Sequence, residues 1–224
     1  MISHEHKCIF IHIPKTGGMS VEQALGIDLK KLHGTKKNHD FKHGYPTHPR
    51  YKKNWDTFYK FTVVRNPWAR LVSSYFFDLH HATKRLADPP EGASSKKLAW
   101  WERRRLGLRP RRQLIYDFGA DGFADCMKKY LSSWSENKLI YKPQARWLRP
   151  GQPGQSLSAY DRICLLENIT EDFALVCEDL GTTAELPCIN STSHKPYREY
   201  YDGPLINLVE SIYQKDIERF SYEF

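Results

Sequence analysis

Two short runs of apolar residues near the start of the chain predict buried β-strands. The first covers residues 7–13 and stops at Pro14, and the second covers residues 58–64 and stops at Arg65. Their length and their content of β-branched and aromatic residues are typical of strands buried on both faces. Helical spacing follows each run, over residues 20–25 and 67–81. A strand, a loop and a helix, repeated, predict an α/β fold with a parallel sheet.

Capping residues mark where several predicted helices begin and end. Asn66 is a preferred N-cap residue, and Pro67 suits the first helical position. A helix from Glu171 to Leu180 ends before Gly181, a typical C-cap residue. A third strand is predicted over residues 162–168, and further amphipathic helices over residues 122–134, 136–148 and 204–220.

Length and composition indicate the class of protein. A chain of 224 residues with 40% hydrophobic residues suits one globular domain over residues 1–224. The first apolar run is too short to cross a membrane and does not resemble a secretory signal, so no transmembrane segment is predicted. We expect a cytoplasmic protein, free or membrane-associated, unless the native chain carries a Golgi-type anchor that has been removed from this sequence.

The cysteines indicate neither a disulfide framework nor a metal site. Their number is odd, and they show no CxxC or Cys/His spacing. Most of them lie among apolar residues, so we expect reduced thiols in the core and no metal. They are Cys8, Cys126, Cys164, Cys177 and Cys188.

Positive charge is concentrated in two stretches of a chain whose net charge is +8. Residues 29–53 hold eight Lys or Arg against one acid, and residues 84–112 hold ten against three. Because the remainder is acidic, the two stretches predict contact with an anion, which could be a cofactor, a glycan, nucleic acid or a lipid headgroup. A solvated basic face is the alternative.

The segment IFIHIPKTGGMS, residues 9–20, carries the strongest indication of chemistry. A strand that ends in a turn with two glycines and then enters a helix directs several backbone N–H groups at one point, where phosphate binds readily. Lys15 adds a positive charge, and Thr16 and Ser20 add hydroxyl groups. The lysine precedes the glycines, unlike that of a Walker A loop, and no acidic strand for a metal is evident. This order argues against an ordinary nucleotide hydrolase, and a structural turn is the alternative.

The segment VRNPWARLVSSY, residues 64–75, predicts a second anion site. Arg65 leaves the end of the second strand where a helix begins, and its planar guanidinium can bind a phosphate through two donors. Ser73, on the second turn of that helix, can reach the same anion. Two such sites at the ends of two parallel strands fit a nucleotide with phosphates at both ends.

These two segments resemble the 5′-phosphosulfate loop and the 3′-phosphate loop of the sulfotransferases that use 3′-phosphoadenosine 5′-phosphosulfate (PAPS). The branch they resemble most includes the carbohydrate sulfotransferases and their short bacterial relatives. The similarity continues through YKPQARWL, through LLENITEDFALVCEDLG and through the end of the chain from Asn190. The resemblance implies a three-layer α/β fold like that of the P-loop nucleotide-binding proteins, with a central parallel sheet flanked by helices.

The resemblance also implies a role for each loop residue. The first loop would hold the 5′-phosphosulfate, and Lys15 would stabilise the charge that develops on the leaving oxygen. Arg65 and Ser73 would hold the 3′-phosphate, and Lys195 is a further candidate for it. The family usually has Thr or Ser at residue 19, so Met19 lacks a hydroxyl donor. The implied cofactor-binding residues of the first loop are Lys15, Thr16, Gly17, Gly18, Met19 and Ser20.

A general base is needed because the attacking hydroxyl must lose a proton. Histidine suits this role near neutral pH. Related carbohydrate sulfotransferases take their base from the region between the two loops, where this chain has His33, His39, His43 and His48. We favour His43, because the stretch beginning KHGYPTH resembles the family's approach to the second loop. His39 and His48 are the main alternatives, and each of these residues can equally be an exposed loop histidine.

The hypothesis is a PAPS-dependent sulfotransferase that transfers a sulfuryl group to an acceptor hydroxyl without a metal and releases 3′-phosphoadenosine 5′-phosphate (PAP). We interpret residues 84–118, which include Trp100 and Trp101, as a basic insertion on the acceptor side. Aromatic faces and guanidinium groups suit an anionic carbohydrate. They also suit single-stranded nucleic acid, but the implied cofactor favours a glycan and no nucleic acid partner is expected. The alternatives are a non-catalytic anion- or glycan-binding protein and, less favoured, a nucleotide-dependent kinase.

Overall fold

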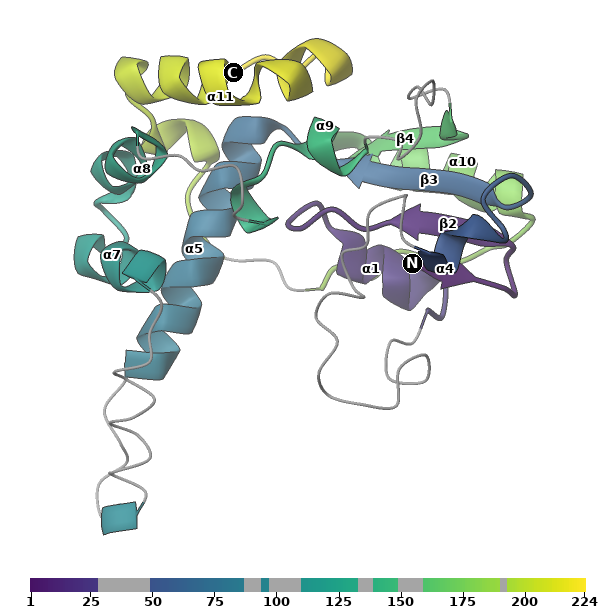
Figure 1. The fold of residues 1–224 in the computed structure, drawn as a ribbon, viewed down its shortest axis with the longest axis horizontal. Helices are drawn as coiled ribbons and strands as arrows, with labels where there is room; N and C mark the ends of the chain where they lie inside the picture. Colours follow the sequence, from purple (N-terminus) through teal and green to yellow (C-terminus); the bar gives the residue numbers. More distant parts are fainter. Residues whose placement is uncertain (28–48, 87–93, 97–109, 133–138, 149–158, 190–192) are drawn as a thin grey trace.

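A four-stranded sheet with the order β1-β2-β3-β4 lies at the centre of the fold (Figure 1). The computed structural model describes residues 1–27, 49–86, 94–96, 110–132, 139–148, 159–189 and 193–224. β2, β3 and β4 run parallel, and the short β1 pairs antiparallel with β2. The strands are β1 (Ile2–Ser3), β2 (Cys8–Ile11), β3 (Tyr59–Val64) and β4 (Arg162–Leu165). The predicted α/β class with a parallel sheet is therefore confirmed, and β1 is an addition that the sequence did not indicate.

The register of the parallel strands brings the loops after β2 and β3 together. Ile11, the last residue of β2, pairs with Thr62 of β3. The Thr62 hydroxyl also donates to the Ile11 carbonyl oxygen at 2.8 Å. Because the carboxyl ends of parallel strands meet at one edge of a sheet, the loops that follow them share that edge.

Helices on both faces of the sheet complete the three layers. Phe10 and Val63 pack in one apolar cluster with α1 (Gly18–Ala24) and α10 (Ile169–Leu180). Ile11 and Val64 belong to the other, larger cluster, because successive strand residues point to opposite faces. That cluster takes its helical side chains from α5 (Pro67–Leu86), α7 (Pro110–Phe118), α8 (Phe123–Ser132), α9 (Gln144–Trp147) and α11 (Gly203–Phe220).

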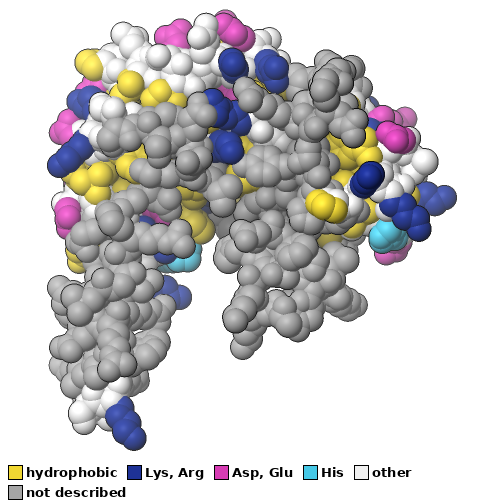
Figure 2. Space-filling view, in the orientation of Figure 1, with side chains coloured by type: hydrophobic (Ala, Val, Ile, Leu, Met, Phe, Trp, Pro, Cys, Tyr) yellow, Lys and Arg dark blue, Asp and Glu magenta, His cyan; other side chains and the backbone are white. Residues whose placement is uncertain are grey.

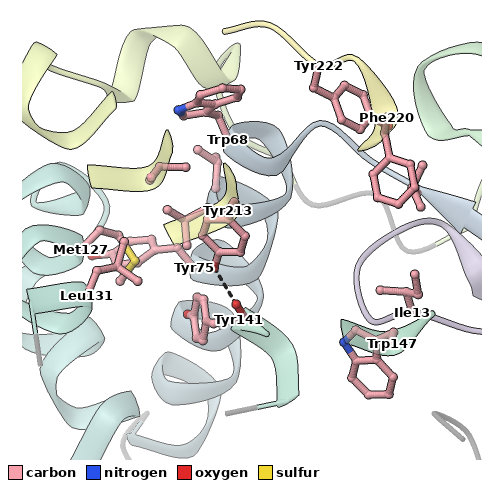
Figure 3. Packing of buried hydrophobic residues seen from close by; sticks show 14 of the residues in the cluster. Ile13, Trp68, Tyr75, Met127, Leu131, Tyr141, Trp147, Tyr213, Phe220 and Tyr222 are labelled. Carbon is pink, nitrogen blue, oxygen red and sulfur yellow. Dashed lines mark hydrogen bonds between the residues drawn. The ribbon is translucent and has the colours of Figure 1, made fainter. Parts of the chain in front are cut away.

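The larger cluster is rich in buried aromatic side chains (Figure 3). Tyr75 of α5 meets Phe123 of α8 edge to face, with ring centroids 5.1 Å apart. The buried Tyr213 hydroxyl donates to the Tyr141 carbonyl oxygen at 2.6 Å (Figure 3). Aromatic pairs in this geometry stabilise a core beyond the area that they bury. They fix α5, which carries the second loop, against the C-terminal half of the chain.

Local capping residues predicted several helix ends correctly. The Asn66 side-chain oxygen accepts hydrogen bonds from the backbone N–H groups of Trp68 and Ala69, at 3.1 and 3.2 Å, and so caps α5. Gly181 ends α10 in the left-handed conformation, with φ of 62°. The last helix also ends at Phe220, as its spacing predicts.

Two predicted elements differ from those observed. The single helix predicted over residues 136–148 is wrong: a 3-10 turn, η1 (Leu139–Tyr141), and α9 are separated by Pro143, whose backbone is extended. Proline lacks an N–H donor and disfavours a helical conformation in the residue before it. The third strand ends at Leu165, because the chain then turns into η3 (Leu166–Asn168) and leads into α10.

The predicted basic insertion has helical ends. α5 continues to Leu86, so Lys84, where the insertion was expected to begin, lies inside a helix. α7 occupies the other end of the stretch, where the sequence indicated no regular spacing before Phe118. Most of the stretch between them, including Trp100 and Trp101, lies outside the described residues. Two further short helices that were not predicted are α4 (Pro49–Lys52) and η4 (Tyr197–Tyr200).

A network of buried polar groups fixes the chain behind the two loops. Arg70 of α5 is only 2% exposed. It donates to the carbonyl oxygens of Pro14 and Lys142, both at 2.9 Å, and to that of Ile140 at 3.2 Å. The Asp216 carboxylate of α11, also buried, accepts from the backbone N–H groups of Gln144 and Ala145, both at 2.7 Å. Such fully paired networks specify one arrangement of the segments that they join.

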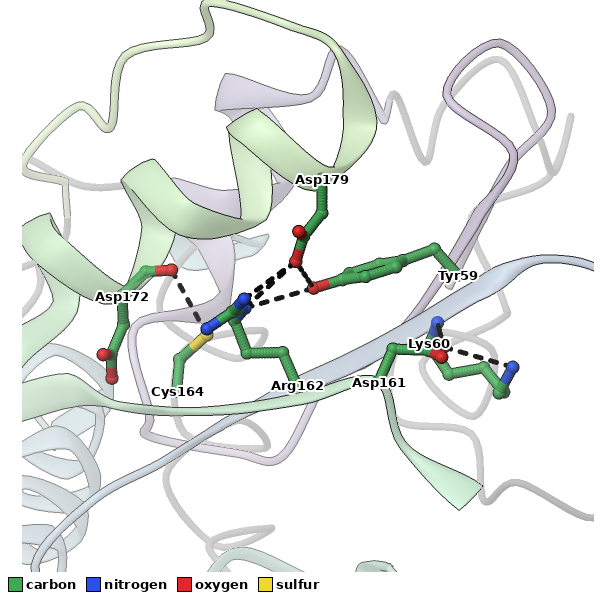
Figure 4. Close-up of polar contacts among 7 residues, drawn as sticks. All are labelled: Tyr59, Lys60, Asp161, Arg162, Cys164, Asp172 and Asp179. Carbon is green, nitrogen blue, oxygen red and sulfur yellow. Dashed lines mark hydrogen bonds and ion pairs between the residues drawn. The ribbon is translucent and has the colours of Figure 1, made fainter. Parts of the chain in front are cut away.

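The amino ends of β3 and β4 are joined by polar contacts at the opposite edge of the sheet (Figure 4). Arg162 forms an ion pair with Asp179 of α10 at 2.9 Å, and the Tyr59 hydroxyl donates to the same carboxylate at 2.5 Å. The Asp161 carboxylate accepts the backbone N–H of Lys60 at 2.6 Å. Asp161 and Asp179 are exposed and their partners are partly exposed, so these contacts contribute modestly to stability. Their place at the far edge separates them from the loops after β2 and β3.

On the face that Figure 2 shows, hydrophobic side chains of described residues lie in several separate areas, with charged side chains between and around them. Among the described helices, none combines the length and the apolar character that crossing a bilayer requires. The prediction of reduced thiols is confirmed, because all five cysteines are free. Four of them are buried, and Cys188 is exposed.

Candidate active site

Two glycines allow the chain to turn closely from β2 into α1. Gly17 has a φ of 77°, in the left-handed region that favours glycine. A Cβ atom on Gly17 would lie 2.7 Å from the Leu166 side chain, and one on Gly18 would lie 2.3 Å from the ring of His12. The buried His12 ring is itself held by a hydrogen bond to the Glu22 carboxylate of α1. Packing therefore requires both glycines, and the turn requires Gly17 as well.

Lys15 lies at the centre of the first loop in an unusual conformation. Its φ of 69° is positive, which is rare for a residue with a side chain. Its ammonium nitrogen lies 4.3 Å from the centre of the Phe77 ring of α5. Burial lowers the pKa of Lys15 to about 8; the positive charges of Arg65 and Arg70 lower it further, whereas Asp78 opposes the shift.

The remaining first-loop residues differ in what they present to solvent. Thr16 is buried, and its hydroxyl donates to the Ile13 carbonyl oxygen at 3.0 Å, so this hydroxyl closes the loop. The role of Thr16 toward an anion stays a prediction. Ser20 is partly exposed on the first turn of α1, and Met19 is 41% exposed.

Arg65 occupies the second loop and meets the first. Its guanidinium donates to the Lys15 carbonyl oxygen at 3.5 Å. The Gln144 amide holds its backbone from both sides: the Arg65 N–H donates to Gln144 Oε1 at 2.9 Å, and Gln144 Nε2 donates to the Arg65 carbonyl oxygen at 2.7 Å. Gln144 is thus a buried amide that fixes the second loop.

Ser73 and Phe77 line the same side of α5, since they are four residues apart. Ser73 is 5% exposed, and its hydroxyl makes no hydrogen bond with any described residue. Because the Lys15 ammonium lies over the Phe77 ring, this side of α5 is turned toward the first loop. The structure therefore brings Lys15 and Arg65 together, and it places Ser73 on the side of α5 that is turned toward the first loop.

Positive charge at this point is not balanced by ion pairs. Burial lowers the pKa of Lys15 and of Arg65; the charges of Arg65 and Arg70 lower that of Lys15 further, and the charge of Arg70 also lowers that of Arg65. No described carboxylate lies within ion-pair distance of Lys15 or Arg65. Burying cations without partners is costly, so the arrangement favours binding of an anion. Within the described residues, no group of three or more His, Cys, Asp or Glu could hold a metal ion.

The structure describes Lys195 but not the four candidate bases. Lys195 is exposed, and its neighbour His194 stacks on Phe76 of α5, with ring centroids 5.4 Å apart. The segment thus returns to the helix that carries Ser73, while the role of Lys195 stays a prediction. His33, His39, His43 and His48 all lie outside the described residues.

Sequence reasoning missed several residues around the site. Phe77 could have been found from its helical spacing to Ser73. Its ring also contacts that of His81, at 4.4 Å between centroids. Burial, followed by the charges of Arg112 and His80, lowers the pKa of His81. Arg70 is visible in the motif RNPWAR, but no local pattern indicates that its partners are distant carbonyl groups.

The fold and the site together define a P-loop-like α/β protein, with two cationic loops at the carboxyl edge of a parallel sheet. The model of one family, described as the sulfotransferase family, matches residues 1–223. This chain therefore belongs to the sulfotransferase family, and its general activity is sulfuryl transfer. Comparison with curated proteins and with solved structures finds no match in either set.

We predict that Gly18→Ala will disrupt the first loop. The added methyl group must displace the His12 ring from Glu22, and overpacking of this kind costs about 1–3 kcal/mol. The thermal unfolding midpoint, measured by differential scanning calorimetry, should fall by roughly 5 °C. Gly203→Ala is the matched control, because a Cβ atom there meets nothing within 4 Å. Equal behaviour of the two variants would show that the close contact with His12 is not a constraint.

Proposed function

We propose that this sulfotransferase uses PAPS as donor and transfers its sulfuryl group to a hydroxyl of a carbohydrate acceptor. The observation that carries the proposal is the meeting of Lys15 and Arg65, whose contact at 3.5 Å joins the two strand-end loops. PAPS carries anionic groups at both ends of one adenosine. Two cationic loops side by side, each without a carboxylate partner among the described residues, suit such a molecule.

The donor-binding roles follow from the contacts of each loop. Lys15 and the backbone N–H groups of residues 16–20 bind the 5′-phosphosulfate. Arg65 and Ser73 bind the 3′-phosphate. Gln144 fixes the Arg65 backbone, and Ser73 lies on the side of α5 that is turned toward the first loop. Lys195 is a further ligand of that phosphate, through the segment that packs on α5.

Transfer proceeds by in-line displacement at sulfur. The acceptor oxygen forms a bond to sulfur, the bond from sulfur to the bridging phosphate oxygen breaks, and the acceptor proton passes to His43. PAP then leaves. Lys15 stabilises the negative charge that develops on the bridging oxygen, which is where a cation accelerates the reaction. The Phe77 ring holds the ammonium without neutralising it, so the full charge remains for the transition state.

A carbohydrate acceptor is favoured by the basic stretch over residues 84–118 and by its tryptophans. The described parts of this stretch place Arg112 of α7 beside Asp78 of α5, with Nε and Oδ1 3.0 Å apart. Asp78 in turn influences Lys15, so the end of the stretch lies close to the reacting group. Guanidinium groups there suit a glycan that carries carboxylate or sulfate.

The direct test is replacement of Lys15. Lys15→Met should lower the rate of transfer from radiolabelled PAPS, over a panel of glycan acceptors, by about a hundredfold or more, since loss of one such contact costs about 3 kcal/mol. Lys215→Met, on the exposed side of α11, is the matched control and should leave the rate unchanged. Thermal stabilisation of the wild type by ATP with magnesium but not by PAP would contradict the proposal and favour a kinase. Binding of PAP without turnover of any acceptor would favour a non-catalytic anion-binding protein.

The pH dependence should report the lowered pKa of Lys15. The protonated ammonium is the active form, so kcat/KM for the donor should fall as the pH rises through about 8, the pKa of this group in the free protein. Lys15→Arg should be slower but should lose this alkaline limb, because a guanidinium stays protonated. An unchanged limb in that variant would assign the titration to another group.

Replacement of the base should affect the chemical step rather than donor binding. His43→Asn should lower kcat by about 10²-fold or more while the dissociation constant for PAP stays the same. His81→Asn is the comparison, since His81 contacts Phe77 from α5 and is not required as base by the proposal. Loss of turnover in His81→Asn alone would move the role of base to that residue.

A further inference from the structure

The last residues of the chain fold back onto the second loop. α11 ends at Phe220, and Ser221 turns the chain with a left-handed conformation at φ of 54°. The Tyr222 backbone N–H then donates to the Ile217 carbonyl oxygen at 3.1 Å. Tyr222 is thereby buried next to Phe220 (Figure 3). The tail, residues 222–224, then contacts the start of α5.

Two sets of contacts hold this tail. The Asn66 side-chain amide, which caps α5 through its oxygen, donates through Nδ2 to the Glu223 carbonyl oxygen at 2.8 Å. The Phe224 ring meets the rings of Trp68 and Tyr201, with centroids 5.7 and 5.4 Å apart. The tail is therefore fixed on the residues that directly follow Arg65.

Glu167 connects the tail to the loop. One of its carboxylate oxygens, Oε1, accepts the backbone N–H of Asn66 at 2.8 Å, and the other, Oε2, accepts the Tyr222 hydroxyl at 3.1 Å. Both oxygens are thus directed at donors other than the Arg65 guanidinium. Glu167 nevertheless lies close enough to Arg65 to raise the pKa of that group. An anion at this position competes with a phosphate for Arg65 unless its orientation is fixed.

We propose that Tyr222 is a positioning residue, whose hydroxyl fixes the Glu167 carboxylate so that the Arg65 guanidinium stays available to the 3′-phosphate of the donor. This inference rests on the proposed function. Without the hydroxyl, Glu167 Oε2 turns toward Arg65 and forms the ion pair that the native contacts prevent. The tail then acts on donor binding without touching the donor.

The test compares ligands with and without the 3′-phosphate. In Tyr222→Phe, the affinity for PAP should fall about tenfold, the usual scale for one hydrogen bond to a charged group. The affinity for adenosine 5′-monophosphate, which lacks the 3′-phosphate, should not change. The KM for PAPS should rise while kcat at saturating donor stays the same. Tyr116→Phe is the matched control, since Tyr116 is exposed on α7.

A second variant separates positioning from general stability. In Tyr222→Phe with Glu167→Gln, the neutral amide cannot form an ion pair with Arg65, so PAP affinity should return toward the wild-type value. A thermal unfolding midpoint measured for each variant shows whether the fold is retained. Equal losses for the two ligands, or no rescue by Glu167→Gln, would overturn the inference. If the wild type fails to prefer PAP over adenosine 5′-monophosphate, the proposed donor is wrong and the inference falls with it.

Discussion

The parallel pairing of β2 with β3 is the constraint on which the rest of the site depends. It places the ends of two strands, separated by about fifty residues of chain, next to each other, so that Lys15 and Arg65 meet across one sheet edge. Buried hydrogen bonds then fix each loop in place: Arg70 holds the Pro14 carbonyl, and Gln144 holds the Arg65 backbone. These supports come from α5 and α9, and they add to the contacts that the loops make within and between themselves.

The meeting of the two loops also brings like charges together, which has a cost in electrostatic free energy. Lys15, Arg65 and Arg70 lie close together in a partly buried place, and burial lowers the pKa of each. Pairing each cation with a carboxylate would relieve this cost but would also remove the attraction for an anion. The Phe77 ring under the Lys15 ammonium stabilises this charge in part and leaves it able to attract an anion. Among the described residues no carboxylate forms an ion pair with Lys15 or Arg65, so this concentrated positive charge suits the doubly anionic donor that we propose.

The supports of the site come from parts of the chain that are far apart in sequence. The 3-10 turn η1 supplies the Ile140 carbonyl oxygen for Arg70, and α11 supplies Asp216 for α9. In the tail after α11, the Glu223 carbonyl oxygen accepts a hydrogen bond from Asn66, and the Tyr222 hydroxyl donates to Glu167. Glu167 in turn raises the pKa of Arg65. The second loop is therefore built from residues of both halves of the chain.

The sequence by itself determined the features that rest on local physics. Apolar runs bounded by Pro14 and Arg65 indicated the strands, Asn66 and Gly181 marked helix ends, and the order of lysine and glycines in PKTGG indicated an anion loop. Only the tertiary structure decided that the Thr16 hydroxyl closes its own loop, that Gln144 is structural, and that Phe77 lies under Lys15. The reason is physical: capping and strand propensity act within a few residues. The partners of a buried cation or amide, by contrast, are chosen by which distant segments the sheet and the core bring into contact.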